Sequence, residues 1–124
     1  MANKNIDESF EEGKRRMLTG KPSKKVNVGA AVQVHYLKSD PEVFQAVFDG
    51  RQTFEIRYDD RNYQVGDVLL LQETTFTGKE MAAGAELVYT GRHLLRRVTY
   101  KLSGYGLGQG WVILGTVKEE NDED

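Results

Sequence analysis

The sequence predicts a mainly β domain of the mixed α+β class, built as a small barrel. Short segments rich in β-branched and aromatic residues, with apolar and polar side chains alternating, recur between residues 30 and 117. Glycine-containing segments separate them, and one clear helical pattern comes early. The chain has no internal repeat and no regular alternation of strands with helices, which argues against a doubly wound parallel sheet. Closing the sheet into a barrel would remove its exposed edges.

The first elements are a strand and a short helix. Residues 30–38, "AAVQVHYLK", alternate and are rich in β-branched residues, which predicts a strand. In "SDPEVFQAVFDG", Asp40 can cap a helix and Pro41 suits its first turn, while Gly50 marks its end. The apolar face of this helix comprises Val43, Phe44, Val47 and Phe48.

The remaining segments predict β structure. The expected strands are 52–58, 67–76, a short one at 86–90, a long one at 92–102 and 111–117. The expected turns are "DDRN" at 59–62, a hairpin turn "TGKE" at 77–80, and the glycine loop "SGYGLGQG" at 103–110. Trp111, at the start of the last strand, either stacks on a bound base or, as is more typical, belongs to the core.

Three regions differ in charge. Residues 1–29 carry seven basic and four acidic residues and predict a flexible leader, or alternatively a basic arm that attracts an anionic ligand. The domain proper is 30–117, and residues 118–124 form an expected disordered acidic tail. Between residues 30 and 116, nine basic residues face ten acidic ones. This balance argues against a protein that grips many phosphates, but not against a pocket for one or a few nucleotides.

Composition narrows the function classes further. The 124 residues include no cysteine and only two histidines, His35 and His93, so we expect no metal site and no cofactor. The glycine loop leads into a strand and lacks the Lys-Ser/Thr pair of a phosphate-binding loop. No segment is apolar enough for a membrane span or a secretory signal. We therefore expect a cytoplasmic protein, monomeric and without a membrane partner.

The strand at 52–58 carries the strongest candidate site. Alternation separates its side chains into two faces. We assign one face to the core, namely Phe54, Ile56 and Tyr58. The other face presents Thr53, Glu55 and Arg57, and this hydroxyl, carboxylate and guanidinium can hydrogen-bond a planar polar ligand such as a base. The alternative is a solvated strand face with an ion pair worth about 0–1 kcal/mol.

A second polar face follows in the strand 92–102. Its members are His93, Leu95, Arg97, Thr99 and Lys101. Arg97 could complete a pocket with Glu55 and Arg57. The alternative, which we favour from the residues alone, is that this face is a solvated wall of the barrel.

Two long stretches resemble a known family. "HYLKSDPEVFQAVFDGRQTFEIRYDDRNYQVGDVLLLQE" and "YTGRHLLRRVTYKLSGYGLGQGWVILG" closely resemble the DUF3850 family, which is placed in the ASCH and PUA-like superfamily. The resemblance covers about residues 34–116. It implies a PUA-like β-barrel of the ASCH type with one or two short helices. ASCH domains are thought to bind RNA or nucleotides in a cleft lined by a Gly-x-Lys-x-x-Glu-x-Arg motif.

That motif falls on Gly50, Gln52, Glu55 and Arg57, with Gln52 in place of the lysine. Some small ASCH proteins deacetylate N4-acetylcytidine with a lysine at the position of Gln52 and a threonine at that of Glu55, and this sequence keeps neither. A glutamine amide donates and accepts hydrogen bonds but cannot replace a lysine as base or nucleophile. The resemblance therefore implies a protein that binds a ligand, in preference to one that catalyses a reaction.

We expect an RNA- or nucleotide-binding module that holds its ligand against the strand at 50–57. The expected ligand-binding residues are Gln52, Thr53, Glu55, Arg57 and Arg97. One alternative is a hydrolase of a modified nucleoside or nucleotide, with Glu55 as the general base. Another is a phage or bacterial protein-interaction domain whose charged ends contact an unknown protein partner.

Overall fold

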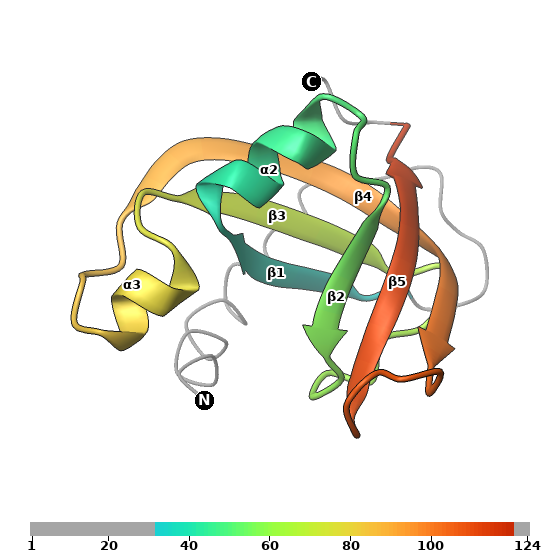
Figure 1. Cartoon of the computed structure of the whole chain (residues 1–124). Coiled ribbons are helices and arrows are strands. Elements are labelled where there is room, and N and C mark those ends of the chain that lie inside the picture. The colour runs from blue at the N-terminus through green and yellow to red at the C-terminus, as the bar shows by residue number, and fades with distance from the viewer. Residues whose placement is uncertain (1–31, 121–124) are drawn as a thin grey trace.

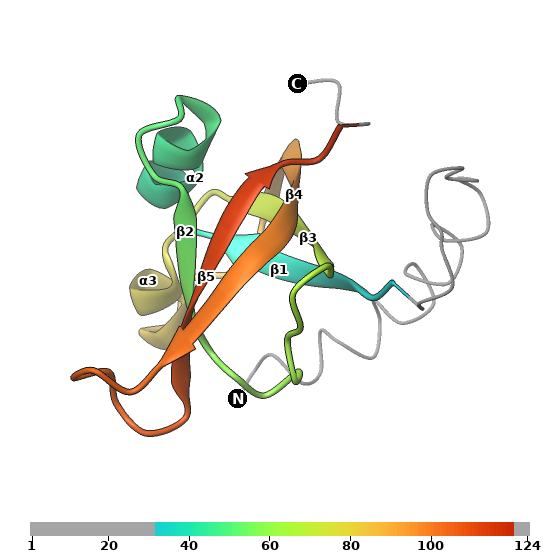
Figure 2. The ribbon, with the colours of Figure 1, turned by 90° about the vertical axis from the view of Figure 1, so that its right-hand side faces the viewer.

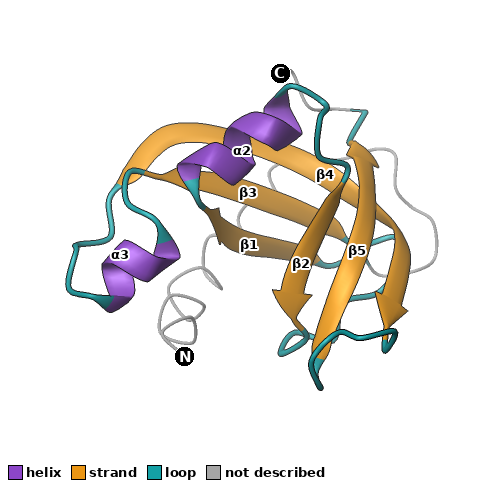
Figure 3. Cartoon of the chain, in the orientation of Figure 1, coloured by secondary structure: helices purple, strands orange, loops and turns teal. Residues whose placement is uncertain are grey.

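The computed structural model describes residues 32–120, and the predicted leader at 1–29 lies outside them. Five strands form one sheet in the order β1-β3-β4-β5-β2, and two short helices accompany it (Figures 1 and 3). The elements are β1 Val34–Ser39, α2 Pro41–Phe48, β2 Phe54–Tyr58, β3 Val68–Thr74, α3 Gly78–Ala82, β4 Tyr89–Ser103 and β5 Trp111–Lys118. The prediction of a mainly β fold with one or two short helices is therefore confirmed. No helix among residues 32–120 is long and apolar enough to cross a membrane.

The sheet curls into a half-barrel because β4 is long and bent. The N-terminal part of β4 pairs with β3 and its C-terminal part pairs with β5, both antiparallel. The register slips between Val98 and Tyr100, and such an irregularity bends a strand. Strands β2 and β5 consequently run across the direction of β1 and β3 (Figures 1 and 2). The parallel pair β1–β3 and the antiparallel pair β5–β2 form the two ends of the sheet, so β1 and β2 are its edges.

The main core lies inside the curl of the sheet. It contains Leu37, Phe44, Val47, Tyr63, Leu69, Leu71, Leu94, Val98, Val112 and Leu114. Phe44 and Val47 of the predicted apolar face of α2 pack in this core, whereas Phe48 of the same predicted face is exposed. Gly50 follows the helix with a φ of +81°, which agrees with its predicted role as the stop.

Asp40 precedes α2, but its carboxylate does not cap that helix. Instead, Oδ1 of Asp40 accepts a hydrogen bond from the backbone N–H of Gly78, the first residue of α3, at 2.9 Å. This contact ties the beginning of one helix to the beginning of the other. The carboxylate thus links the two helical segments beside the edge of β1.

The predicted hairpin turn at 77–80 is wrong, because this segment begins α3. The Thr77 hydroxyl accepts from the backbone N–H of Glu80, and the Glu80 carboxylate accepts from the backbone N–H of Thr77. This reciprocal capping box satisfies two N–H groups that a helix start leaves unpaired. The strands expected at 86–90 and 92–102 are one strand, β4, which continues through Gly91 at a φ of +100°.

The described structure extends past the predicted domain end at residue 117. Lys118 is the last residue of β5, and the Glu119 side chain is buried. Its two carboxylate oxygens accept hydrogen bonds from Nε and Nη2 of Arg97 at 2.9 and 3.1 Å. Residues 121–124 of the predicted tail lie outside the described residues.

Candidate ligand-binding site

Strand β2 faces the opposite way from the prediction. Glu55 is 2% exposed, whereas Ile56 is 50% exposed and its apolar neighbours on that face, Phe54 and Tyr58, are also exposed. The register explains this orientation, because directly opposed residues of antiparallel strands share a face. Glu55 pairs with Leu114, a core residue of β5. The carboxylate of the predicted site therefore points into the half-barrel.

The carboxylate is joined there by a guanidinium. Arg57 pairs with the core residue Val112, and its side chain is largely buried. Nε and Nη2 of Arg57 both donate to Oε1 of Glu55, at 3.3 and 3.0 Å. The core accepts this inward polar pair because the two charges neutralise each other and share hydrogen bonds.

Guanidinium groups also bridge the gap between the two edge strands. Nη2 of Arg57 donates to the carbonyl of Lys38 at 3.0 Å, and Nη1 of Arg61 donates to the carbonyl of Tyr36 at 3.0 Å. These carbonyls lie two residues apart on β1, so both point outward from the free edge of the sheet. We call this gap between β1 and β2 the seam. In a closed barrel a neighbouring strand would donate hydrogen bonds to these carbonyls, and here the two arginine side chains do so.

Two cavities adjoin the seam, and Arg57 lines both of them. The larger has a volume of about 840 Å³ and the smaller about 290 Å³. Both are lined by Lys38, Asp40, Ile56 and Arg57. The prediction that Glu55 and Arg57 stand beside a concave surface therefore has a geometric basis, although they reach it from the inner face of β2.

The smaller cavity contains buried polar atoms that lack partners. Ser39 and Glu55 are each 2% exposed and line it from β1 and β2 respectively. Neither Oγ of Ser39 nor Oε2 of Glu55 has a hydrogen-bond partner among residues 32–120. A buried polar atom without a partner costs about 1–3 kcal/mol. The residues that line this cavity thus include one unpaired carboxylate oxygen, which accepts hydrogen bonds, and one unpaired hydroxyl, which both donates and accepts them.

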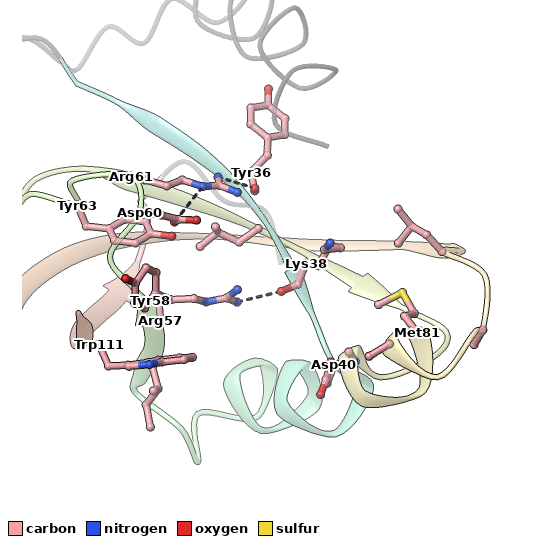
Figure 4. A pocket seen from close by; sticks show the side chains of 16 residues that line it. Tyr36, Lys38, Asp40, Arg57, Tyr58, Asp60, Arg61, Tyr63, Met81 and Trp111 are labelled. Atoms are coloured by element: carbon pink, nitrogen blue, oxygen red, sulfur yellow. Dashed lines mark hydrogen bonds and ion pairs between the residues drawn. The ribbon is translucent and has the colours of Figure 1, made fainter. Parts of the chain in front are cut away.

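The larger cavity has aromatic and basic walls (Figure 4). Tyr58 and Trp111 lie edge to face at one side, with ring centroids 5.6 Å apart. Met81 of α3 lies across the cavity from them, and Arg61 lies near the edge of β1. Trp111 is substantially exposed, so its predicted core role is wrong and its ring is available to a ligand.

Tyr63 also lines the larger cavity but is otherwise part of the core. Burial raises the pKa of its hydroxyl to about 12, although the nearby guanidinium groups of Arg61 and Arg57 act in the opposite direction. The hydroxyl therefore stays neutral at physiological pH. A neutral phenol both donates and accepts hydrogen bonds.

The structure brings together only part of the predicted site. Gln52 lines the smaller cavity with Glu55 and Arg57, and its Nε2 donates to the carbonyl of Phe54 at 2.7 Å. Thr53 is exposed and lines neither cavity. Arg97 also lines neither, because its guanidinium is held by Glu119 and by the carbonyl of Gly66.

Residues that the sequence did not suggest complete the site. Ser39 and Arg61 were not singled out, since Ser39 directly follows a predicted strand and Arg61 lies in a predicted turn. No local pattern marks either residue, because each acts across the seam. The two histidines lie in different surroundings. Nε2 of His35 lies 2.8 Å from Oδ2 of Asp67, and both side chains are buried. His93 is exposed on β4.

A glycine next to the aromatic wall allows a test that needs no ligand. Gly110 has a φ of +86°, and a Cβ placed there would lie 2.5 Å from Cε1 of Tyr58. Gly106, in the same loop, has a φ of +91° and nothing within 4 Å of such a Cβ. The two positions differ in their surroundings but not in their backbone requirement.

We expect Gly110→Ala and Gly106→Ala each to lower the free energy of unfolding by about 1–2 kcal/mol, because alanine is strained at positive φ. Only Gly110→Ala should also displace the Tyr58 ring from Trp111. NMR spectra would then show the indole N–H resonance of Trp111 shifted in Gly110→Ala and unchanged in Gly106→Ala. Similar shifts in both variants would contradict the contact.

Lys101 of β4 holds the loop that follows β2. Its Nζ donates to the carbonyl of Tyr63 at 2.7 Å and lies 2.9 Å from Oδ2 of Asp59. Burial acts to raise the pKa of the Asp59 carboxyl. The Lys101 ammonium and the N–H groups of Tyr63 and Asn62 outweigh it and hold that pKa below its ordinary value of 3.8.

Lys101→Met is expected to lower the free energy of unfolding by about 1 kcal/mol at neutral pH. Folding depresses the pKa of Asp59, so this contribution is present above pH 3.8 and is lost as pH falls through the folded pKa. In urea denaturation, the loss of unfolding free energy caused by Lys101→Met should become smaller below pH 3.8. The remaining loss then reflects only the hydrogen bond from Lys101 to the Tyr63 carbonyl. With Asp59→Asn as the background, the cost should no longer depend on pH, and a remaining dependence would argue against this pair.

Comparisons with known proteins identify the family. Residues 34–116 match the family model described as "Domain of unknown function (DUF3850)", and the chain belongs to this family. A curated relative from Escherichia phage P2, described as "Uncharacterized 12.9 kDa protein in GpA 3'region", is 37% identical over 54 residues. The match covers 41% of this chain and 50% of the relative, so the chain spans about half the length of the curated relative that it matches. The family match includes both edge strands and all the seam contacts described above.

Proposed function

We propose that this DUF3850 protein binds a nucleotide, either free or as part of single-stranded RNA, at the seam between β1 and β2. The base enters the smaller cavity, and the sugar, phosphate or a neighbouring base occupies the larger one. The observation that carries this proposal is the pair of buried polar atoms without partners in residues that line the smaller cavity, Oε2 of Glu55 and Oγ of Ser39.

The smaller cavity suits an uncharged group. Two acidic residues, Asp40 and Glu55, and two basic residues, Lys38 and Arg57, line it, so their charges balance. Its volume of about 290 Å³ is just below the range for small-molecule sites, which is about 300–1,000 Å³. A single planar base matches both its size and its hydrogen-bonding groups.

The larger cavity suits the rest of a nucleotide or a second one. Its lining includes three basic residues, Lys38, Arg57 and Arg61, and two acidic ones, Asp40 and Asp60. This slight positive excess favours one phosphate over a run of phosphates. Trp111 adds an exposed ring on which a base can stack, and such stacking contributes about 1–3 kcal/mol per base.

Binding can be tested with variants of two exposed aromatic residues. Trp111→Ala removes the ring beside the larger cavity, while Tyr105→Ala removes a more exposed ring from the preceding loop, which lines neither cavity. Short single-stranded RNAs and nucleoside monophosphates would be titrated while backbone amide resonances are followed. We expect shifts clustered at residues 36–40 and 52–61.

Trp111→Ala should weaken RNA binding about tenfold, in line with the loss of one stacking contact, and Tyr105→Ala should leave it unchanged. If no nucleotide or RNA shifts the resonances of the two edge strands, the proposal fails. Equal loss of affinity in both variants would place the ligand outside this seam.

A further inference from the structure

We infer that the outer face of the sheet, where β2, β5 and β4 lie side by side, binds a second copy of this chain. The inference does not depend on a ligand at the seam, and the composition alone had led us to expect a monomer. It depends on the apolar side chains that this face exposes, on their register and on the absence of charge among them.

Strand β2 exposes its apolar side. Phe54, Ile56 and Tyr58 are exposed, whereas Glu55 and Arg57 of the same strand turn inward. An antiparallel sheet with one solvated face commonly does the reverse, with apolar residues in the core and polar residues in water. The apolar side of β2 is therefore buried only if another surface covers it.

The apolar surface continues across the two neighbouring strands (Figure 2). Directly opposed residues of antiparallel strands share a face. Strand β5 places a residue opposite each of the three from β2, and β4 extends two of these rows, which adds Gly115, Ile113, Trp111, Tyr100 and Leu102. We call these eight positions the outer apolar face. None of the eight residues is charged.

The exposed area of the outer apolar face approaches what a stable dimer needs. Four of its residues are aromatic and 38–59% exposed, namely Phe54, Tyr58, Tyr100 and Trp111. An aromatic side chain buries about 150–250 Å² when it is fully covered, so these four offer about 400 Å² between them, and Ile56 adds to this area. One side of a standard interface buries about 800 Å², of which about 450–520 Å² is apolar.

The chemistry of the outer apolar face favours a second copy over a nucleic acid. Single-stranded nucleic acids bind where basic residues accompany aromatic ones, and this face has no basic residue. An uncharged apolar face is complementary to itself, as a two-fold interface requires. The net charge of the chain is only −2, so the repulsion between two copies is weak. A second copy therefore covers these side chains without burying a charge.

Tyr100→Lys tests this face without changing the proposed ligand site. Tyr100 is well exposed and lines neither cavity, so its replacement should preserve the fold and the seam. In a dimer the lysine ammonium would be buried among apolar side chains, which is costly. Tyr105→Lys is the matched control, because Tyr105 is also an exposed tyrosine but lies in the loop between β4 and β5. Tyr58 and Trp111 stay unchanged because they also line the larger cavity.

The test is sedimentation equilibrium of the full chain without ligand, over protein concentrations from about 1 µM to 1 mM. We expect the unmodified chain to form dimers in this range. Tyr100→Lys should raise the dissociation constant about 30-fold or more, the effect of losing one central aromatic contact, and Tyr105→Lys should leave it unchanged. Amide spectra verify that both variants are folded. On dilution of the unmodified chain, resonances at 54–58, 100–102 and 111–115 should shift together.

A chain that stays monomeric at every concentration would overturn the inference. A dimer that Tyr100→Lys leaves intact, or that both variants weaken equally, would also overturn it, since the copies would then meet elsewhere. A monomer whose affinity for single-stranded RNA falls in Tyr100→Lys would make the outer apolar face a nucleic-acid surface instead. Because sedimentation is measured without nucleotide, failure of the dimer leaves the proposed function at the seam standing.

Discussion

Arg57→Met is expected to lower the free energy of unfolding by about 3–5 kcal/mol, the range observed when one partner of a buried ion pair is removed. The Glu55 carboxylate, 2% exposed, would lose both hydrogen bonds to its oxygen Oε1 and keep no compensating cation at that position. The carbonyl of Lys38 would lose its donor as well, so the seam between the edge strands would weaken.

A matched control for Arg57→Met lies at the end of α2. Nε and Nη2 of Arg51 donate to Oδ2 of Asp49 at 3.2 and 2.9 Å, again two residues apart along the chain. This pair has nearly the same geometry but is exposed to solvent. Arg51→Met should therefore have a much smaller effect in urea denaturation, since exposed ion pairs are screened by water and salt.

The double variant Arg57→Met with Glu55→Gln gives a further check. Because the cost of Arg57→Met comes mainly from the stranded carboxylate, replacing Glu55 by the neutral glutamine should recover a large part of it. Equal losses in Arg57→Met and Arg51→Met would show that the Glu55–Arg57 pair is not buried at the seam.

Leu114→Ala is expected to lower the free energy of unfolding by about 2–5 kcal/mol. Leu114 is fully buried in the core of the half-barrel and lies directly opposite Glu55 in the β2–β5 register. Its replacement removes apolar contacts and leaves a cavity next to the carboxylate. The neighbouring Ile113 faces the other side of the sheet and is only partly buried.

Ile113→Ala is therefore the control for Leu114→Ala, with a loss of about 1 kcal/mol. Urea denaturation of both variants measures which face of β5 is the inner one, and the register then determines the inward direction of β2. A larger loss for Ile113→Ala than for Leu114→Ala would reverse that orientation and remove Glu55 from the interior.

The half-barrel geometry accounts for where the proposed site lies. An open sheet has two edges with unpaired backbone groups, and proteins commonly cover or blunt such edges. Here Arg57 and Arg61 hydrogen-bond the edge of β1 from the side of β2, and the volume that they do not fill forms the two cavities. Polar side chains are therefore required at this seam before any ligand is considered.

Local patterns predicted most of the secondary structure. The helix after Asp40 begins at Pro41 and ends before Gly50, as the capping and stop residues indicated. The glycine loop lies between the last two strands, where its composition placed it. The helix beginning at Gly78 was missed because "TGKE" is also typical of a turn. The Thr-x-x-Glu spacing of a capping box was the signal that distinguishes the two.

Local patterns could not show which face of β2 turns toward the core. Alternation established that Glu55 and Arg57 share a face, and this holds in the structure. It also suggested that the apolar face with Ile56 packs in the core, and this is wrong. Which face of β2 turns inward depends on its pairing with β5. Val112 and Leu114 of β5 lie in the core, so their partners on β2 also turn inward. The seam, in turn, requires polar groups opposite β1.

By itself, the sequence determined the class of fold, the helix that begins at Pro41 and the residues that share a strand face with Glu55, because these follow from spacing along a single segment. Only the tertiary structure decided that Ser39 and Glu55 line one cavity and that Arg61 donates to the carbonyl of Tyr36. It also decided that Arg97 donates to Glu119 and does not line the predicted site. Each of these contacts joins segments far apart in the chain. They follow from the bend in β4 and from the register of the sheet, which no local pattern contains.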